Sequence, residues 1–149
     1  MARIRRILHP SDFSKASAAA FTKAVELAKT NGAELVLLHV LAPPLPLMAG
    51  EGYVSPKVYE DLEQSARAYA SKGLARLVAK AKKAGVRAKA VLRDGVAHEQ
   101  IVRAAGSPRA DMIVIGTHGR TGLAKLFLGS VAGRVVSTAK CPVMTVRGK

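Results

Sequence analysis

The hydrophobic positions of this chain follow two alternating periods, and this alternation predicts its secondary structure. Short runs of branched and other apolar residues predict five strands, at residues 4–8, 33–40, 86–93, 111–115 and 142–146. Between these runs, apolar residues recur at intervals of three and four, which predicts helices at residues 14–31, 56–84, 96–105 and 131–139. Residues 42–56 are rich in proline and glycine and are expected to form a loop.

Strands that alternate with helices are typical of a parallel sheet with helices on both faces. Residues 33–40 are almost continuously apolar, as in a strand covered on both sides, whereas residues 86–93 mostly alternate apolar with basic side chains, as in an edge strand. We therefore predict an α/β fold with one doubly wound, five-stranded parallel sheet in the order 3-2-1-4-5. The whole chain, residues 1–149, is expected to form a single domain.

The segment that follows the fourth predicted strand is the most informative for function. It reads Gly116-Thr117-His118-Gly119, then nine residues, then Gly129-Ser130 at the start of a predicted helix. Glycines let the backbone approach phosphate oxygens closely, and the unpaired amides of a helix N-terminus attract anions. In the predicted sheet the winding reverses between the first and fourth strands, so Asp12 and Gly116 would face each other across a cleft. This arrangement favours a phosphorylated small molecule as ligand.

Each of these residues also has a simpler interpretation when taken alone. Asp12 could cap the first helix, Gly116 and Gly119 could only turn the chain, and Ser130 is a natural N-cap. Their joint spacing, after one strand and before one helix, favours a nucleotide site. The dinucleotide-binding motif Gly-x-Gly-x-x-Gly and the lysine of a P-loop are both absent from the sequence.

Charge adds a second candidate function. The chain has 24 Lys and Arg against 10 Asp and Glu, a formal net charge of +14, and such a field attracts polyanions. Four basic residues lie on one face of the long predicted helix: Lys72, Arg76, Lys80 and Lys83. Aromatic residues make up only 4% of the chain and none interleaves with these four to stack bases, which favours a solvated face over nucleic-acid binding.

Three further features bear on the cellular location, the role of the cysteine and metal binding. No apolar run has the length of a membrane span and Met1 is not followed by an apolar signal segment, so we expect a cytoplasmic protein without membrane contact. The single cysteine, Cys141, is expected to be a small buried hydrophobe. His9 and His39 fall at strand ends without a third placed ligand, so we expect no metal site.

Four segments together resemble the universal stress protein family, in particular its ATP-binding branch. They are Ile-Leu-His-Pro-Ser-Asp-Phe-Ser at residues 7–14, Leu-Leu-His-Val at residues 37–40, the Gly-x2-Gly-x9-Gly-Ser spacing of residues 116–130, and Ala-Lys-Cys-Pro-Val at residues 139–143. The resemblance spans essentially the whole chain. It implies a Rossmann-like fold of the adenine nucleotide alpha hydrolase type and a site for ATP, ADP or AMP, with Mg²⁺ carried on the phosphates.

The resemblance also implies roles for individual residues. Asp12 would accept hydrogen bonds from the ribose hydroxyls, Val40 would contact the adenine, and the start of the last helix would bind the phosphates. His118 and Arg120 lie in the glycine segment, where either could contact phosphate. The alternative for His118 is to pack the loop, and the alternative for Arg120 is exposure to solvent. The full set of implied nucleotide-binding residues is Pro10, Asp12, Val40, Ile115, Gly116, His118, Gly119, Arg120, Gly129, Ser130 and Val131.

These observations predict a cytoplasmic ATP-binding stress-response protein that acts as a regulatory or protective module with little or no turnover. We expect no dedicated catalytic residue, and at most slow ATP hydrolysis or autophosphorylation. The family resemblance also implies a homodimer in which the last strand, residues 142–146, pairs with its copy. The alternatives are a nucleic-acid-associated protein that uses the four-residue basic face, and a slow ATPase.

Overall fold

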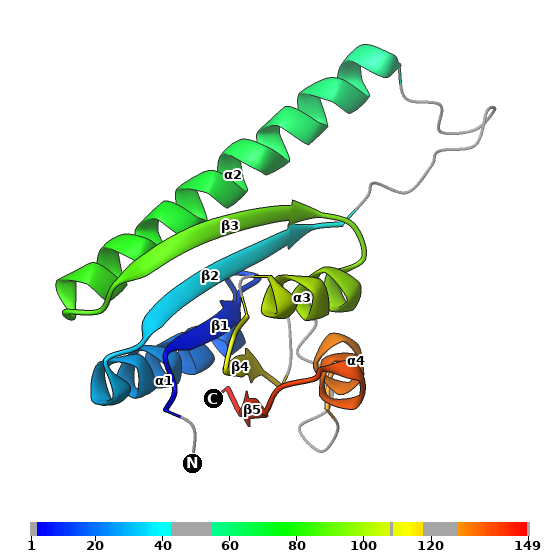
Figure 1. Cartoon of the computed structure of the whole chain (residues 1–149). Coiled ribbons are helices and arrows are strands. Elements are labelled where there is room, and N and C mark those ends of the chain that lie inside the picture. The colour runs from blue at the N-terminus through cyan, green and yellow to red at the C-terminus, as the bar shows by residue number, and fades with distance from the viewer. Residues whose placement is uncertain (1–2, 43–54, 108, 118–127, 149) are drawn as a thin grey trace.

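A computed structural model describes residues 3–42, 55–107, 109–117 and 128–148 of the chain. Strands and helices alternate along it, and the strands form one five-stranded parallel sheet (Figure 1). The elements are β1 (Arg6–Pro10), α1 (Lys15–Asn31), β2 (Glu34–Leu41), α2 (Pro56–Lys83), β3 (Ala88–Asp94), α3 (Ala97–Gly106), β4 (Met112–Gly116), α4 (Ser130–Thr138) and β5 (Val143–Val146).

The sheet order is β3-β2-β1-β4-β5, which confirms the predicted order and the doubly wound α/β class. The strand boundaries differ by one or two residues from those predicted. The largest shift is in β1, which runs over Arg6–Pro10 instead of residues 4–8, because its pairing with β2 begins at Arg6↔Glu34 and continues to Pro10↔Leu38. Hydrophobicity alone placed this strand too early, because His9 is polar and Pro10 is cyclic. Both residues are nevertheless buried and belong to β1.

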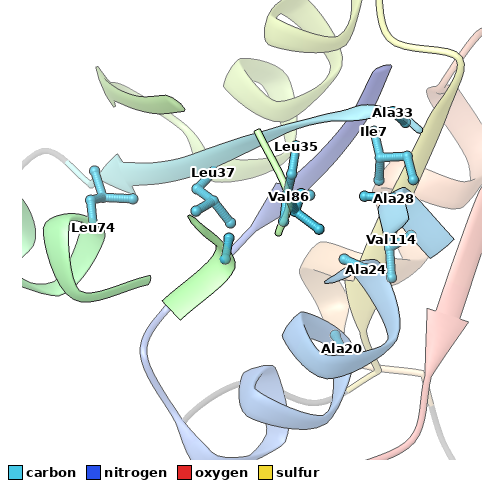
Figure 2. Close-up of a cluster of buried hydrophobic side chains, with 11 residues drawn as sticks. Ile7, Ala20, Ala24, Ala28, Ala33, Leu35, Leu37, Leu74, Val86 and Val114 are labelled. Atoms are coloured by element: carbon cyan, nitrogen blue, oxygen red, sulfur yellow. The ribbon is translucent and has the colours of Figure 1, made fainter. Parts of the chain in front are cut away.

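Two hydrophobic clusters lie on opposite faces of the sheet. On one face, α1 and α2 cover Ile7, Leu35 and Leu37, and alanines of α1 allow this helix to pack closely on the strands (Figure 2). On the other face, Ile101 of α3 and Val135 of α4 pack against the second cluster. The central strands are therefore apolar on both sides, as predicted for residues 33–40.

Local signals set the ends of α1. The hydroxyl of Ser14 caps the first turn by accepting the amide of Ser17, and Gly32 ends the helix in a left-handed conformation at φ 63°. At the amino ends of the strands, the side chain of Asp111 accepts the amides of Arg5 and Arg6. These two hydrogen bonds join the start of β1 to the start of β4. These contacts hold the edge of the sheet that lies away from the predicted ligand.

Helix α2 is longer than the surface it covers. Residues 55–66 are all exposed, and full burial begins at Ala70. The first half of α2 extends beyond the sheet (Figure 1). Its second half carries the predicted basic face, on which Lys72, Arg76, Lys80 and Lys83 are all exposed. None of the helices in the described ranges combines the length and hydropathy needed to cross a membrane.

Candidate functional site

The pairing of β1 with β4 ends where the winding of the sheet reverses, and we call the positions beyond the last pair the opening. Strands β1 and β4 pair only at Ile7↔Met112 and Leu8↔Ile113, although both strands continue beyond these positions. The last residues of β1 and of β4 therefore have no ladder bonds to each other. A parallel doubly wound sheet binds ligands at such a reversal, outside the carboxyl ends of its strands.

His9 lies in β1, immediately after the last residue that pairs with β4. Its ring is fully buried, and Nδ1 donates a hydrogen bond to the carbonyl oxygen of Val114 over 2.9 Å. The side chain of His9 thus links β1 to β4 beyond the point where the backbone pairing of the two strands ends. Burial lowers the pKa of His9 from 6.5 to about 4, while the bond to Val114 and the charge of Asp12 oppose this shift. His9 is therefore neutral at physiological pH, with the proton on Nδ1.

Asp12 follows β1 at the mouth of the opening. Its Oδ1 atom accepts the amide of Ser14 over 2.9 Å and the hydroxyl of Ser17 over 2.6 Å. Ser14 is the residue that caps α1, so the simpler interpretation of Asp12 as the N-cap is wrong. The carboxylate is instead fixed in a turn immediately before the helix, at the carboxyl edge of the sheet.

Phe13 has an unusual backbone conformation next to this carboxylate. Its φ is 65°, a left-handed conformation that costs an L-residue roughly 1–2 kcal/mol. The ring stacks on His39 of β2 with centroids 4.6 Å apart and meets Tyr69 of α2 edge-on at 5.8 Å. A Cβ atom at Gly73 of α2 would lie 2.6 Å from the ring, so only glycine fits there without displacement. We refer to Phe13, His39, Tyr69 and Gly73 as the Phe13 cluster.

The start of α4 forms the other side of the candidate site. Gly129 is the N-cap, with φ −58° and no side chain to bond the first-turn amides. Its own amide donates to the carbonyl of Thr117 over 2.6 Å, so the phosphate contact predicted for this amide is already used for a bond within the chain. The amides of Ser130 and Val131 lie in the first turn, where a helix supplies no carbonyl for them. Ser130 and Val131 are both exposed.

The remaining predicted residues lie at the same edge or outside the described residues. Pro10 is the buried last residue of β1, and Ile115 and Gly116 end β4. Val40 is half-buried near the end of β2, on the face that α3 and α4 cover. Gly116 packs on α1, since a Cβ there would lie 3.2 Å from the carbonyl of Ala16. His118, Gly119 and Arg120 lie outside the described residues.

The described residues contain no group of three or more His, Cys, Asp or Glu side chains that could hold a metal ion. Asp94, an acidic residue at the end of β3, forms a 2.6 Å bond with Arg67 of α2. Cys141 is half-buried beside the second cluster, and burial raises the pKa of its thiol. Reactive cysteines have a lowered thiol pKa, whereas that of Cys141 is raised, so Cys141 fits a role in packing.

Sequence reasoning missed three contributors to this site: Phe13, Ser17 and Gly73. The sequence contains the Asp-Phe-Ser run and a glycine at position 73. Nothing in the hydrophobic periodicity indicated that the ring of Phe13 would contact Gly73. Only the fold brings these two residues together.

Comparison with known proteins identifies the class. The model of the universal stress protein family matches residues 3–147, so this chain belongs to that family. Universal stress protein MJ0531 of Methanocaldococcus jannaschii is 33% identical over 96% of this chain and 82% of its own length. A universal stress protein of Thermus aquaticus is 36% identical over 92% of each chain.

Solved structures extend the comparison to the fold. The structure of MJ0577 superimposes with a TM-score of 0.84 at 26% identity, covering 99% of each chain. An Arabidopsis thaliana universal stress protein family member solved with AMP bound has a TM-score of 0.70 at 25% identity, covering 97% of this chain and 92% of that one. Adenine-nucleotide binding is thus found among the structural relatives of this chain.

Proposed function

We propose that this protein binds ATP, or ADP or AMP, at the carboxyl edge of the sheet, and that the bound nucleotide sets the state of a stress-response regulatory or protective module. The single observation that carries the proposal is the separation of β1 from β4 at the point where the winding reverses. A carboxylate lies on one side of that opening, and the uncapped first turn of α4 lies on the other.

The chemistry of the two sides suits the two ends of a nucleotide. Asp12 would accept the ribose hydroxyls, and the amides of Ser130 and Val131 would donate to phosphate oxygens. Val40 would contact the adenine from β2, while Pro10, Ile115 and Gly116 would line the sugar. Gly129 would contribute by having no side chain where the phosphates approach, since its amide is bonded to Thr117. His118, Gly119 and Arg120 complete the proposed set by sequence position.

Turnover is proposed to be slow or absent. Two acids lie at or just after the carboxyl ends of strands, Asp12 and Asp94, where a group that activates water or a metal would be expected. Asp94 is paired with Arg67 at 2.6 Å, and the Oδ1 atom of Asp12 accepts bonds from Ser14 and Ser17. Mg²⁺ would travel with the phosphates, whose oxygens supply most of its ligands when a protein offers few.

The proposed assembly is a homodimer through β5, an edge strand of the sheet. The carbonyls of Pro142 and Val146 accept amides from the β4 side, so by alternation Val143 and Thr145 direct backbone groups outward. Pairing with a second copy would satisfy these groups. A cytoplasmic location and a single domain over residues 1–149 complete the proposal.

Calorimetry with ATP tests the site. Gly129→Val should abolish binding, because a side chain there would occupy the approach to the first turn of α4, while the unfolding temperature stays close to that of the original chain. Gly133→Ala is the matched control, since a Cβ at this position one turn further along α4 meets only Leu128 at 3.8 Å. Unchanged ATP affinity in Gly129→Val would refute the assignment of the phosphate site.

A further inference from the structure

We propose that Phe13 is a positioning residue, whose ring, held between His39 and Gly73, keeps the carboxylate of Asp12 oriented toward the nucleotide ribose. The inference rests on the proposed function, because the ribose contact of Asp12 is part of that function. It adds that α2, which contributes none of the proposed nucleotide-binding residues, controls how well the site recognises the sugar.

The turn that carries Asp12 is attached to two of its neighbours by hydrogen bonds. Toward β2, the amide of Ser11 donates to the carbonyl of Leu38 over 2.8 Å, and Nδ1 of His39 donates to the carbonyl of Ser11 over 2.7 Å. Toward α1, the hydroxyl of Ser17 donates to Asp12 over 2.6 Å. These bonds hold the turn at the carboxyl edge of the sheet, and its direction after Asp12 follows the backbone of Phe13.

The backbone of Phe13 sets the orientation of the carboxylate directly. The amide of Ser14 donates to Oδ1 of Asp12, so this hydrogen bond spans Phe13. In this structure the geometry of the bond follows the backbone of Phe13, whose φ is 65°. That conformation is unfavourable for an L-residue, so surrounding contacts must retain it. The amide of Phe13 donates to the hydroxyl oxygen of Ser11 over 3.0 Å, and the ring makes further contacts.

The Phe13 cluster supplies the contacts of the ring. The ring of Phe13 is parallel to that of His39 within 20°, with centroids 4.6 Å apart. The Phe13 ring also lies against α2, where Gly73 has no side chain to occupy the space of the ring. Three ring atoms would lie 2.6–2.9 Å from a Cβ at position 73, closer than real Cβ atoms approach their neighbours. A side chain at position 73 must therefore displace the ring, and with it the turn.

A double-mutant cycle tests this coupling. The variants are Phe13→Ala, Gly73→Ala and their combination, with Gly106→Ala as a control because a Cβ at that position meets nothing within 4 Å. The measurement is the ratio of the affinities for ATP and for 2′,3′-dideoxy-ATP, which lacks the ribose hydroxyls. A purely structural role for Phe13 would change both affinities alike and leave the ratio unchanged.

The original chain and Gly106→Ala should prefer ATP by roughly tenfold or more, the value of hydrogen bonds to a carboxylate. Phe13→Ala and Gly73→Ala should each bring the ratio close to one. Adding Gly73→Ala to Phe13→Ala should change nothing further, because the ring it displaces is gone. Hydrogen exchange of the Ser14 amide in nucleotide-free protein should be faster in both single variants, as its bond to Asp12 is lost.

The outcomes separate the two proposals. An original chain that binds no adenine nucleotide would overturn the proposed function and this inference with it. Normal ATP binding with an unchanged ratio in folded Phe13→Ala would overturn only the inference. A Gly73→Ala effect that persists in the Phe13→Ala background would also overturn it, because the effect would then act by another route.

Discussion

Replacing His9 by asparagine should remove much of the acid sensitivity of the folded protein. Burial lowers the pKa of His9 to about 4, whereas in the unfolded chain the ring is solvated and titrates near 6.5. Between these two pH values the unfolded state binds a proton that the folded state does not bind. The free energy of unfolding therefore decreases as the pH falls through this window.

The size of the effect follows from the shift. Each unit of pKa depression corresponds to about 1.4 kcal/mol, so acidification from about pH 6.5 to 4 should cost roughly 3 kcal/mol. The free energy of unfolding of a typical protein is about 5–15 kcal/mol, so this loss would be a large fraction of the total stability. Asparagine is the suitable replacement because its Nδ2 atom corresponds to Nδ1 of histidine and can still donate to Val114, but it does not titrate.

Urea unfolding of nucleotide-free protein, repeated at pH values from about 7 to 4, measures the effect. His9→Asn should be less stable near neutral pH, because a smaller side chain leaves space in the core, yet should lose roughly 3 kcal/mol less on acidification. All other ionisable groups are present in both proteins, so their contributions cancel in the difference. Parallel stability curves for the two proteins would refute the argument, as would an NMR titration of the ring near 6.5.

Three further predictions concern the helices and the sheet edge. Gly32→Ala should lower the free energy of unfolding by about 1–2 kcal/mol, because Gly32 has φ 63°, while the open position Gly106→Ala should change it by less than about 0.5 kcal/mol in urea unfolding. Thr145→Pro should convert the proposed dimer into a folded monomer, as measured by light scattering; a monomeric original chain at micromolar concentration would contradict the dimer. Binding of single-stranded DNA should be weak and largely lost at about 0.15 M salt, and tight binding there would favour the nucleic-acid alternative. ATP affinity should be unchanged when four basic residues are replaced by glutamate: Lys72, Arg76, Lys80 and Lys83.

The architecture was predictable because its signals are local. The period of the apolar residues identified the nine elements of the described residues, and the predicted end of the first helix at residue 31 is confirmed. The basic alternation of residues 86–93 placed β3 correctly at an edge of the sheet. Boundaries were less predictable where pairing overrides hydrophobicity, as at His9 and Pro10, which belong to β1 because β2 extends beside them.

The site was only partly predictable, because its geometry depends on contacts between distant residues. The position of Asp12 beside the reversal followed from the sheet order, but its bonds to Ser14 and Ser17 did not. The amide of Gly129 looked available from its place before a helix, yet the fold directs it to Thr117. No sequence pattern relates Phe13 to Gly73, which lie 60 positions apart in the chain.

Native mass spectrometry of the purified protein tests the central claim most directly. The opening between β1 and β4, with Asp12 on one side and the first turn of α4 on the other, predicts one adenine nucleotide per chain, either copurified or acquired on incubation with ATP. Gly129→Val should show none under the same conditions. A folded original chain that acquires no nucleotide mass even at millimolar ATP would contradict the account.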